Sequence, residues 1–135
     1  MPDLPQPTTT LDTTLGFEGF EFDGEASARA RLPVTDAIRQ PFGIVHGGAY
    51  AALAESLCSR ATLDAVGPAN IAIGQSNETS FLRPASAGVV HAAATARHRG
   101  RTNWVWDVEM SDESGRLLAL SRMTIAVRPM PHAAT

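Results

Sequence analysis

The sequence predicts a single α+β domain in which one apolar helix packs against an antiparallel sheet. An apolar run rich in alanine and leucine follows the glycine pair Gly47–Gly48, which predicts a long helix. Four runs with strand-like alternation follow that helix, and a pair of shorter ones precedes it. A chain of 135 residues is about the length of one domain.

The segment before the helix predicts an arm and a hairpin. Residues 1–16 carry several prolines and threonines, and we expect a flexible N-terminal arm with at most one helical turn. Two alternating runs predict strands at Phe17–Phe22 and Ala26–Pro33, turned at Asp23-Gly24, a pair typical of tight hairpins. Thr35-Asp36 predicts a cap for a short turn before the glycine pair.

The predicted helix contains one acidic residue within an apolar run. Apart from this residue, Glu55, nearly every position from Ala49 to Leu57 is apolar, which favours a helix buried on most sides. A carboxylate buried there is costly unless it is paired or used in function, so Glu55 is either a site residue or part of a solvent-facing stripe. Glu55, Ser59 and Thr62 stand at i, i+4 and i+7, which predicts that they share one face.

The segment after the helix predicts a four-strand antiparallel meander. Gly67-Pro68 ends the helical pattern. Trp104 and Trp106 belong to the clearest alternation, that of a half-buried strand. The predicted strands are Asn70–Leu82, Gly88–His98, Thr102–Ser111 and Leu117–Arg128. The domain is therefore expected to span residues 17–129, with a C-terminal tail at 130–135.

Composition and known motifs exclude several classes of protein. The net charge of -3 argues against a general nucleic-acid binder, and the N-terminus lacks the pattern of a signal peptide. No run is long enough to span a membrane, so we expect a soluble, cytoplasmic protein without a membrane partner. The single cysteine, Cys58, lies on the apolar helix and is expected to be a small core residue.

The motifs of several enzyme classes are also missing from the sequence. There is no nucleophile elbow, phosphate-binding loop or dinucleotide fingerprint. His91 and His98 are seven residues apart on a predicted strand, which places them on opposite faces, and no Cys/His spacing indicates a metal site. We therefore expect neither a metal nor a cofactor.

The start of the helix has the features of a site for a carbonyl oxygen. The first N–H groups of a helix lack internal partners, and glycine lets a ligand approach them closely. Gly47 and Gly48 are thus either oxyanion donors or a tight turn, and His46 beside them is more often a structural histidine. Glu55 lies about 12 Å along the axis from Gly47. If both act on one carbonyl, Glu55 must come from a second subunit, which predicts a two-fold dimer.

A second cluster of charge lies on the predicted strands. Four arginines and two histidines occur between Glu78 and Asp107 without an acidic residue among them: Arg83, His91, Arg97, His98, Arg99 and Arg101. Such a surplus could bind a phosphorylated small molecule, or the residues could be scattered over the surface.

At these residues the sequence resembles the hotdog-fold acyl-CoA thioesterases, and within them the Arthrobacter-type 4-hydroxybenzoyl-CoA thioesterase. The likeness extends from about Phe17 to Pro129. It is carried by Arg39-Gln40, Gly43, Val45-His-Gly-Gly-Ala-Tyr50, Ala52-Leu-Ala-Glu55, Gly74-Gln-Ser-Asn77, Thr79-Ser-Phe81, Arg83-Pro84, Trp104, Trp106-Asp-Val108, Gly115-Arg-Leu117 and Ile125-Ala-Val-Arg-Pro129.

The resemblance implies a hotdog fold, a sheet of about five to six antiparallel strands wrapped around one long helix. It also implies a homotetramer built from two dimers and metal-free hydrolysis of an aromatic acyl-CoA. The Gly47 N–H would polarise the thioester carbonyl with support from Gln40, and His46 would help to position the thioester. Glu55 of the partner subunit would act as nucleophile or as general base, with Ser59 near the acyl ring and the attacking water.

The resemblance further implies contacts to the CoA moiety by Arg83, Arg101 and Thr102. A further arginine of the family falls on Pro131, where this chain departs from the pattern. The expected substrate is 4-hydroxybenzoyl-CoA, as in the degradation of aromatic compounds. The alternative substrates are phenylacetyl-CoA and 1,4-dihydroxy-2-naphthoyl-CoA. The alternative functions are those of a domain that binds acyl-CoA without turnover and of a hydratase or dehydratase.

Overall fold

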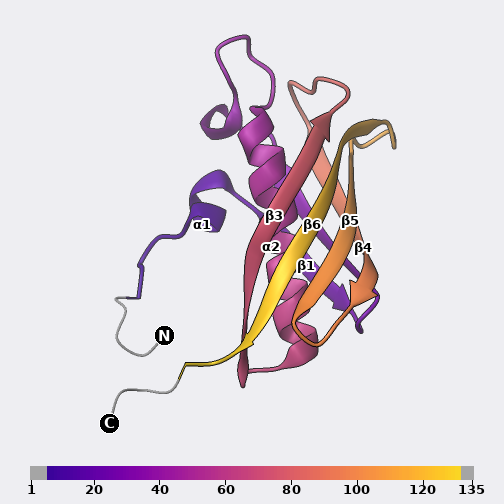
Figure 1. Cartoon of the computed structure of the whole chain (residues 1–135). Helices are drawn as coiled ribbons and strands as arrows, with labels where there is room; N and C mark the ends of the chain where they lie inside the picture. The colour runs from indigo at the N-terminus through magenta and orange to yellow at the C-terminus, as the bar shows by residue number, and fades with distance from the viewer. Residues whose placement is uncertain (1–5, 132–135) are drawn as a thin grey trace.

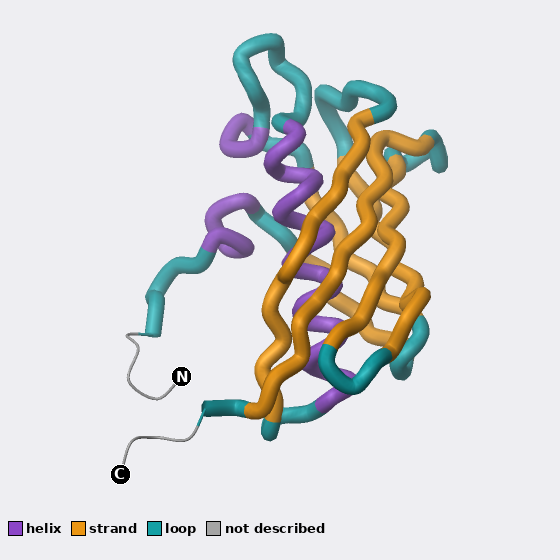
Figure 2. The backbone as a smooth tube through the Cα atoms, in the orientation of Figure 1, coloured by secondary structure: helices purple, strands orange, loops and turns teal. Residues whose placement is uncertain are grey.

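The computed structural model describes residues 6–131 as one layer of sheet curved around one long helix (Figures 1 and 2). The elements in chain order are α1 (Leu11–Leu15), β1 (Glu18–Asp23), β2 (Ser27–Pro33), the 3-10 turn η1 (Asp36–Ile38), α2 (Gly47–Val66), β3 (Asn70–Phe81), β4 (Val89–Arg99), β5 (Asn103–Ser111) and β6 (Leu117–Pro129). The predicted hotdog fold of the α+β class is confirmed. None of these helices is long and apolar enough to cross a bilayer.

The six strands form one antiparallel sheet in the order β1-β2-β4-β5-β6-β3. The predicted four-strand meander is therefore wrong in one respect, because only β4, β5 and β6 are consecutive neighbours. After α2 the chain enters at the far edge, and β3 pairs with β6 along its whole length, from Asn70 opposite Pro129 to Phe81 opposite Ala119. Alternation along a strand tells which face is buried but not which strand lies beside it.

The core lies between the inner face of the sheet and α2. Four side chains of β5 and β6 are fully buried there, as are Leu53 and Leu57 of α2; the four are Trp106, Met110, Met123 and Ile125. Hydrophobic burial of this kind is the main source of stability in a domain of this size.

Thr62 belongs to this core, and the prediction that it shares a face with Glu55 is wrong. Its hydroxyl donates to the Cys58 carbonyl at 2.7 Å and accepts from Trp106 Nε1 at 2.9 Å. The indole N–H needs an acceptor where it is buried, and Thr62 supplies it. The adjacent Cys58 is also fully buried, as expected, and burial raises the pKa of its thiol.

The helix α2 has two different faces, so the prediction that it is buried on most sides is also wrong. Its buried residues form one stripe: Ala49, Tyr50, Leu53, Ala54, Leu57, Cys58, Ala61 and Thr62. The opposite face carries Gly48, Ala51, Ala52, Glu55, Ser56 and Ser59, which are exposed or half-buried. The sequence looked apolar all round because the small residues of this open face are mostly alanine and glycine.

The helix α1 is attached to the open side of α2 by one acidic residue. Asp12 accepts hydrogen bonds from Ser56 Oγ at 2.6 Å and from the Arg60 guanidinium at 2.7 Å. The Arg60 guanidinium also lies 4.1 Å from the ring centre of Phe20 on β1. The expected helical turn of the arm thus forms at residues 11–15, and it is held by charge rather than by a buried side chain.

Candidate active site

The start of α2 leaves one backbone donor free. His46 is the N-cap, and its Nδ1 accepts the Gly48 N–H at 2.8 Å. The Ala49 N–H donates to the His46 carbonyl at 2.9 Å. No group in residues 6–131 accepts the Gly47 N–H, which lies at the positive end of the helix dipole. His46 therefore sets which amide of the glycine pair stays available.

A pocket of about 500 Å³ opens at this helix start. It brings together three of the predicted site residues, because Gln40, Gly47 and Arg83 all line it. The side-chain oxygen of Gln40 accepts the Phe42 N–H, so its amide NH2 remains to donate to a ligand. A tight loop holds Gln40 there, in which its N–H donates to the Ile44 carbonyl at 2.9 Å.

Two aromatic side chains form the apolar wall of this pocket. A side-chain carbon added to Gly47 would lie 2.9 Å from the Phe81 ring, so only glycine leaves room for that ring. Phe81 also contacts the ring of Tyr50, with 6.2 Å between centroids. The pocket thus combines polar donors at the helix start with an apolar lining, as small-molecule sites do.

Glu55 lies on the open face of α2, away from this pocket. Its side chain is exposed and packs beside Gly74 of β3, where an added carbon would lie 2.8 Å from its carboxyl group. Farther along β3, Asn77 Nδ2 donates to the Ala51 carbonyl at 2.8 Å. The strand therefore runs antiparallel to α2, with Gly74 beside Glu55 and Phe81 over Gly47. Within one chain the Glu55 carboxylate therefore lies beside Gly74, whereas Gly47, with its free N–H, lies beside Phe81.

The remaining predicted residues lie at two other places. Ser59 is half-buried on α2, one turn beyond Glu55. Arg101 and Thr102 are exposed in the turn between β4 and β5, where the Thr102 carbonyl accepts the Val127 N–H at 2.9 Å. Val127 pairs with Ala72 near the start of β3, whereas Arg83 follows the end of that strand. In one chain these CoA-contact candidates are therefore not brought together.

The other arginines of the predicted basic cluster are paired with acidic residues. Arg97 lies 3.5 Å from Asp107, and Arg99 lies 3.5 Å from Glu25. Arg83 and Arg101 form no ion pair with any described residue. The phosphate-binding interpretation therefore applies to these two residues and not to the whole cluster.

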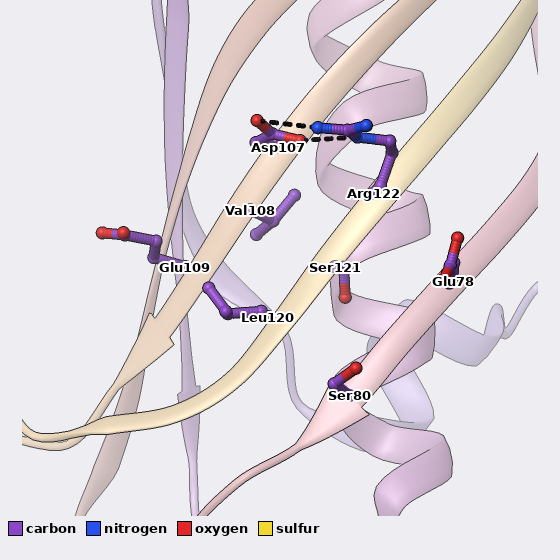
Figure 3. A pocket seen from close by; sticks show the side chains of 8 residues that line it. All are labelled: Glu78, Ser80, Asp107, Val108, Glu109, Leu120, Ser121 and Arg122. Carbon is purple, nitrogen blue, oxygen red and sulfur yellow. Dashed lines mark hydrogen bonds and ion pairs between the residues drawn. The ribbon is translucent and has the colours of Figure 1, made fainter.

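A hollow on the outer face of β3, β5 and β6 is lined by three carboxylates, those of Glu78, Asp107 and Glu109, and by one guanidinium, that of Arg122. Figure 3 shows Asp107 joined to Arg122, whose Nε lies 2.9 Å from the Asp107 carboxylate. The hydrogen bond and charge of Asp107 raise the pKa of Arg122. Glu78 and Ser80 of β3 lie at the other side of this hollow. None of the predicted site residues lines it.

The prediction for the two strand histidines is wrong. The pairing of β4 with β5 shifts by one residue between Ala96 and His98. His91 and His98 are both exposed, and both pair with outward-facing residues of β5, His91 with Ser111 and His98 with Val105. In a regular strand, side chains seven positions apart lie on opposite faces, but the extra residue of the bulge puts these two on the same face. Residues 6–131 hold no group of three acidic, histidine or cysteine side chains suited to a metal.

Sequence reasoning missed three neighbours of the site: Tyr50, Gly74 and Phe81. The glycine inside an otherwise regular strand was a usable signal, because such a glycine often marks a close approach by another group. Phe81 and Tyr50 gave no comparable signal, since an aromatic residue on a strand end or apolar helix usually belongs to the core.

Comparisons with known proteins agree with this geometry. The family model described as "Thioesterase superfamily" matches residues 42–119, which include the helix start, Glu55 and most of the sheet. A solved thioesterase of Haemophilus influenzae superposes with a TM-score of 0.86 and 32% identity, covering 94% of this chain and 89% of that one. A variant of a Pseudomonas aeruginosa thioesterase gives a TM-score of 0.84 and 37% identity, over 90% and 87% of the two chains.

The chain belongs to the thioesterase superfamily and is a thioester hydrolase with the hotdog fold. One relative, 36% identical over 87% of this chain and 95% of its own, is the 1,4-dihydroxy-2-naphthoyl-CoA hydrolase of Listeria monocytogenes. Another is a proofreading thioesterase of Cronobacter turicensis, 35% identical over 88% of each chain.

Proposed function

We propose that the protein hydrolyses an aromatic acyl-CoA to the free carboxylic acid and CoA. The observation that carries the proposal is the pocket at the start of α2, where two donors have no protein acceptor. The Gly47 N–H and the Gln40 amide both reach this pocket, and Arg83 lies at its rim. Donors fixed in this way stabilise the negative charge that develops on a thioester carbonyl oxygen during acyl transfer.

The second half of the site is proposed to come from another copy of the chain. Glu55 and Gly47 face different neighbours in one chain, and Glu55 lies on the open face of α2. An antiparallel pairing of two α2 helices would bring Glu55 of the partner subunit beside this chain's Gly47. The strand β3 is an edge of the sheet in residues 6–131, so its 12 residues offer backbone groups for continuous pairing with a second β3. Two such dimers are proposed to form a tetramer.

The chemistry follows from these positions. The carboxylate of the partner subunit's Glu55 either attacks the thioester carbon or removes a proton from a water that attacks it. The carbonyl oxygen becomes an oxyanion held by the Gly47 N–H and the Gln40 amide. The C–S bond then breaks, CoA leaves as thiolate and takes up a proton, and the acid is released. If Glu55 attacks first, water hydrolyses the resulting anhydride. Ser59 is proposed to orient that water.

An apolar cleft supports an aromatic acyl group. It has a volume of about 840 Å³, lies along the C-terminal half of α2, and is lined by Phe20, Phe22, Leu63 and Ile71 among others. In the antiparallel arrangement this half of the helix extends past the partner's Gly47. Planar apolar groups are stabilised by burial against such side chains.

The acyl group itself is proposed from likeness. The sequence pattern favours 4-hydroxybenzoyl-CoA, whereas the relatives from Listeria monocytogenes and Escherichia coli are named as 1,4-dihydroxy-2-naphthoyl-CoA hydrolases, the latter 36% identical over 80% of this chain. Both substrates carry a hydroxylated aromatic acyl group, and phenylacetyl-CoA lacks the hydroxyl. The CoA end is proposed to contact Arg83 of one subunit and Arg101 and Thr102 of another, because these residues lie at opposite ends of the sheet.

A panel assay tests the proposal. The purified protein is given 4-hydroxybenzoyl-CoA, 1,4-dihydroxy-2-naphthoyl-CoA, phenylacetyl-CoA, benzoyl-CoA and a short alkyl acyl-CoA, and the released thiol is measured. We expect kcat/KM for the hydroxylated aryl substrates to exceed that for the alkyl one by at least about tenfold. Equal rates across the panel would contradict the aromatic preference. Binding of acyl-CoA without thiol release from any substrate would support a domain that binds without turnover.

A further inference from the structure

One residue that lines the site pocket carries a buried polar atom without a partner among the described residues. The hydroxyl oxygen of Tyr50 is inaccessible and makes no hydrogen bond with any described residue, and no other buried side-chain oxygen or nitrogen of residues 6–131 is in this state. The residue as a whole is only 3% exposed. A buried hydroxyl without a partner is costly, because it has lost its hydrogen bonds to water.

The position of Tyr50 connects this unpaired hydroxyl to the pocket. Tyr50 lines the pocket together with Gly47 and Gln40, and it lies three residues after Gly47 on the same helix. Burial raises the pKa of its phenol, so the group stays protonated and can donate.

One of the side chains that contact Tyr50, the ring of Phe81, lies at the surface and can move. Phe81 contacts both Tyr50 and the space above Gly47, yet it is 56% exposed. An exposed ring at the end of an edge strand can rotate without breaking the core. A ligand that displaces Phe81 would reach the Gly47 N–H and the Tyr50 hydroxyl together.

We propose that the Tyr50 hydroxyl is a substrate-binding donor that completes its hydrogen bond on a carbonyl oxygen of the bound acyl-CoA. This inference rests on the proposed function. The carbonyl belongs either to the thioester or to an amide of the pantetheine arm, and both groups accept a hydrogen bond from a phenol. No bond is made or broken by Tyr50 itself. The Tyr50 hydroxyl holds the bound acyl-CoA, once Phe81 has been displaced, so that the thioester carbonyl lies next to the Gly47 N–H.

The test is Tyr50→Phe, which removes only the hydroxyl. We expect kcat/KM to fall by about five- to tenfold, the effect of one lost hydrogen bond. We expect Tm to rise by roughly 3–5 °C, because the variant no longer buries an unpaired polar atom. The Kd for free CoA identifies the acceptor: an unchanged Kd assigns it to the thioester, and a Kd raised by the same factor assigns it to a pantetheine amide.

A matched control is Thr62→Val, which also removes one buried hydroxyl but from a group that has both its partners within the core. This variant should lower Tm and leave kcat/KM unchanged. A Tyr50→Phe protein whose kcat/KM and CoA affinity stay within twofold of the wild type would overturn the inference, whatever its Tm. If the wild type itself releases no thiol from any substrate and binds no CoA, the proposed function fails and the inference fails with it.

Discussion

Glu55 is the residue on which the proposed function depends most. The sequence left it as either a site residue or part of a solvent-facing stripe, and in the chain its carboxylate is exposed on the open face of α2. A carboxylate in water is a weak nucleophile and a weak base. The proposed role therefore depends on a second subunit that covers the residue, excludes water from around the carboxylate and places its own Gly47 N–H nearby.

Replacing Glu55 with glutamine should remove the proposed nucleophile or base while keeping the shape of the side chain. We expect kcat to fall by about 10²- to 10⁴-fold, with little change in the Kd for free CoA. Thiol release and calorimetric titration with CoA measure the two effects. Glu78→Gln changes an exposed carboxylate on the outer face of β3, and it should leave kcat unchanged. Near-normal turnover in Glu55→Gln would remove Glu55 from the chemistry.

Asp112 provides a pH test of the turn between β5 and β6. Its carboxylate accepts from the N–H and hydroxyl of Ser114 and from the N–H and Nε of Arg116. These bonds, led by the one from the Ser114 hydroxyl, hold the pKa of Asp112 well below its usual range.

A carboxyl whose pKa is lowered by folding contributes stability above its unfolded pKa of about 3.9 and loses that stability as the pH falls toward the folded value. Asp112→Asn should therefore lower Tm at pH 7, and the difference from the wild type should shrink progressively below about pH 4. Thermal unfolding between pH 7 and pH 3 measures this. A Tm difference that stays constant over that range would show that the ionised form of Asp112 is not what stabilises the turn.

At the scale of elements, α1 is attached by the polar contacts of Asp12 and by Leu15, which is half-buried against the core. Asp12 binds both Ser56 and Arg60 of α2, and α1 has no buried residue of its own. Asp12→Ala should therefore cost about 1 kcal/mol, a value reduced because Arg60 is half exposed. It should also speed hydrogen exchange at residues 11–16, and Glu113→Ala, on an exposed loop, should change neither. Unchanged exchange at these amides would mean that other contacts hold α1.

Most elements of the fold could be predicted from the sequence, because each carries a local signal. The Asp23-Gly24 pair marks the hairpin, and the alternation through Trp104 and Trp106 marks β5 to within a residue of its observed start. The neighbour of β3 could not be predicted, since pairing depends on contacts far apart in sequence. The prediction that the two histidines lie on opposite faces was wrong because a β-bulge leaves no clear trace in the sequence pattern.

The candidate site was predictable only in part, for a similar reason. The free Gly47 N–H follows from the rules of helix ends, and its spacing from Glu55 argued for two subunits. The unpaired hydroxyl of Tyr50 could not be foreseen, because only the arrangement of its surroundings reveals a missing partner.

At the scale of the whole molecule, the proposed site exists only in an assembly. Activity per chain should then fall on dilution, in step with dissociation measured by sedimentation. Ile73 is 56% exposed on the edge strand β3, so Ile73→Asp should weaken self-association and activity together, because charge is costly where two edges pair. Ala93→Asp, on the exposed face of β4, should affect neither. A chain that stays fully active as a monomer would contradict the shared site.

The contact between Gly74 and Glu55 has a consequence for how activity can be inferred from motifs. An added methyl group at position 74 would lie 2.8 Å from the carboxyl group, in space that the side chain of Glu55 now occupies. Since that side chain is flexible, Gly74→Ala should fold with a nearly unchanged Tm while the carboxylate takes another rotamer and kcat drops, which thermal unfolding and thiol release would show together. Such a protein would retain every reactive group and still be a poor enzyme. Under the proposed role of Glu55, the absence of a methyl group at position 74 is a requirement of catalysis, and a relative with alanine there deserves its own assay.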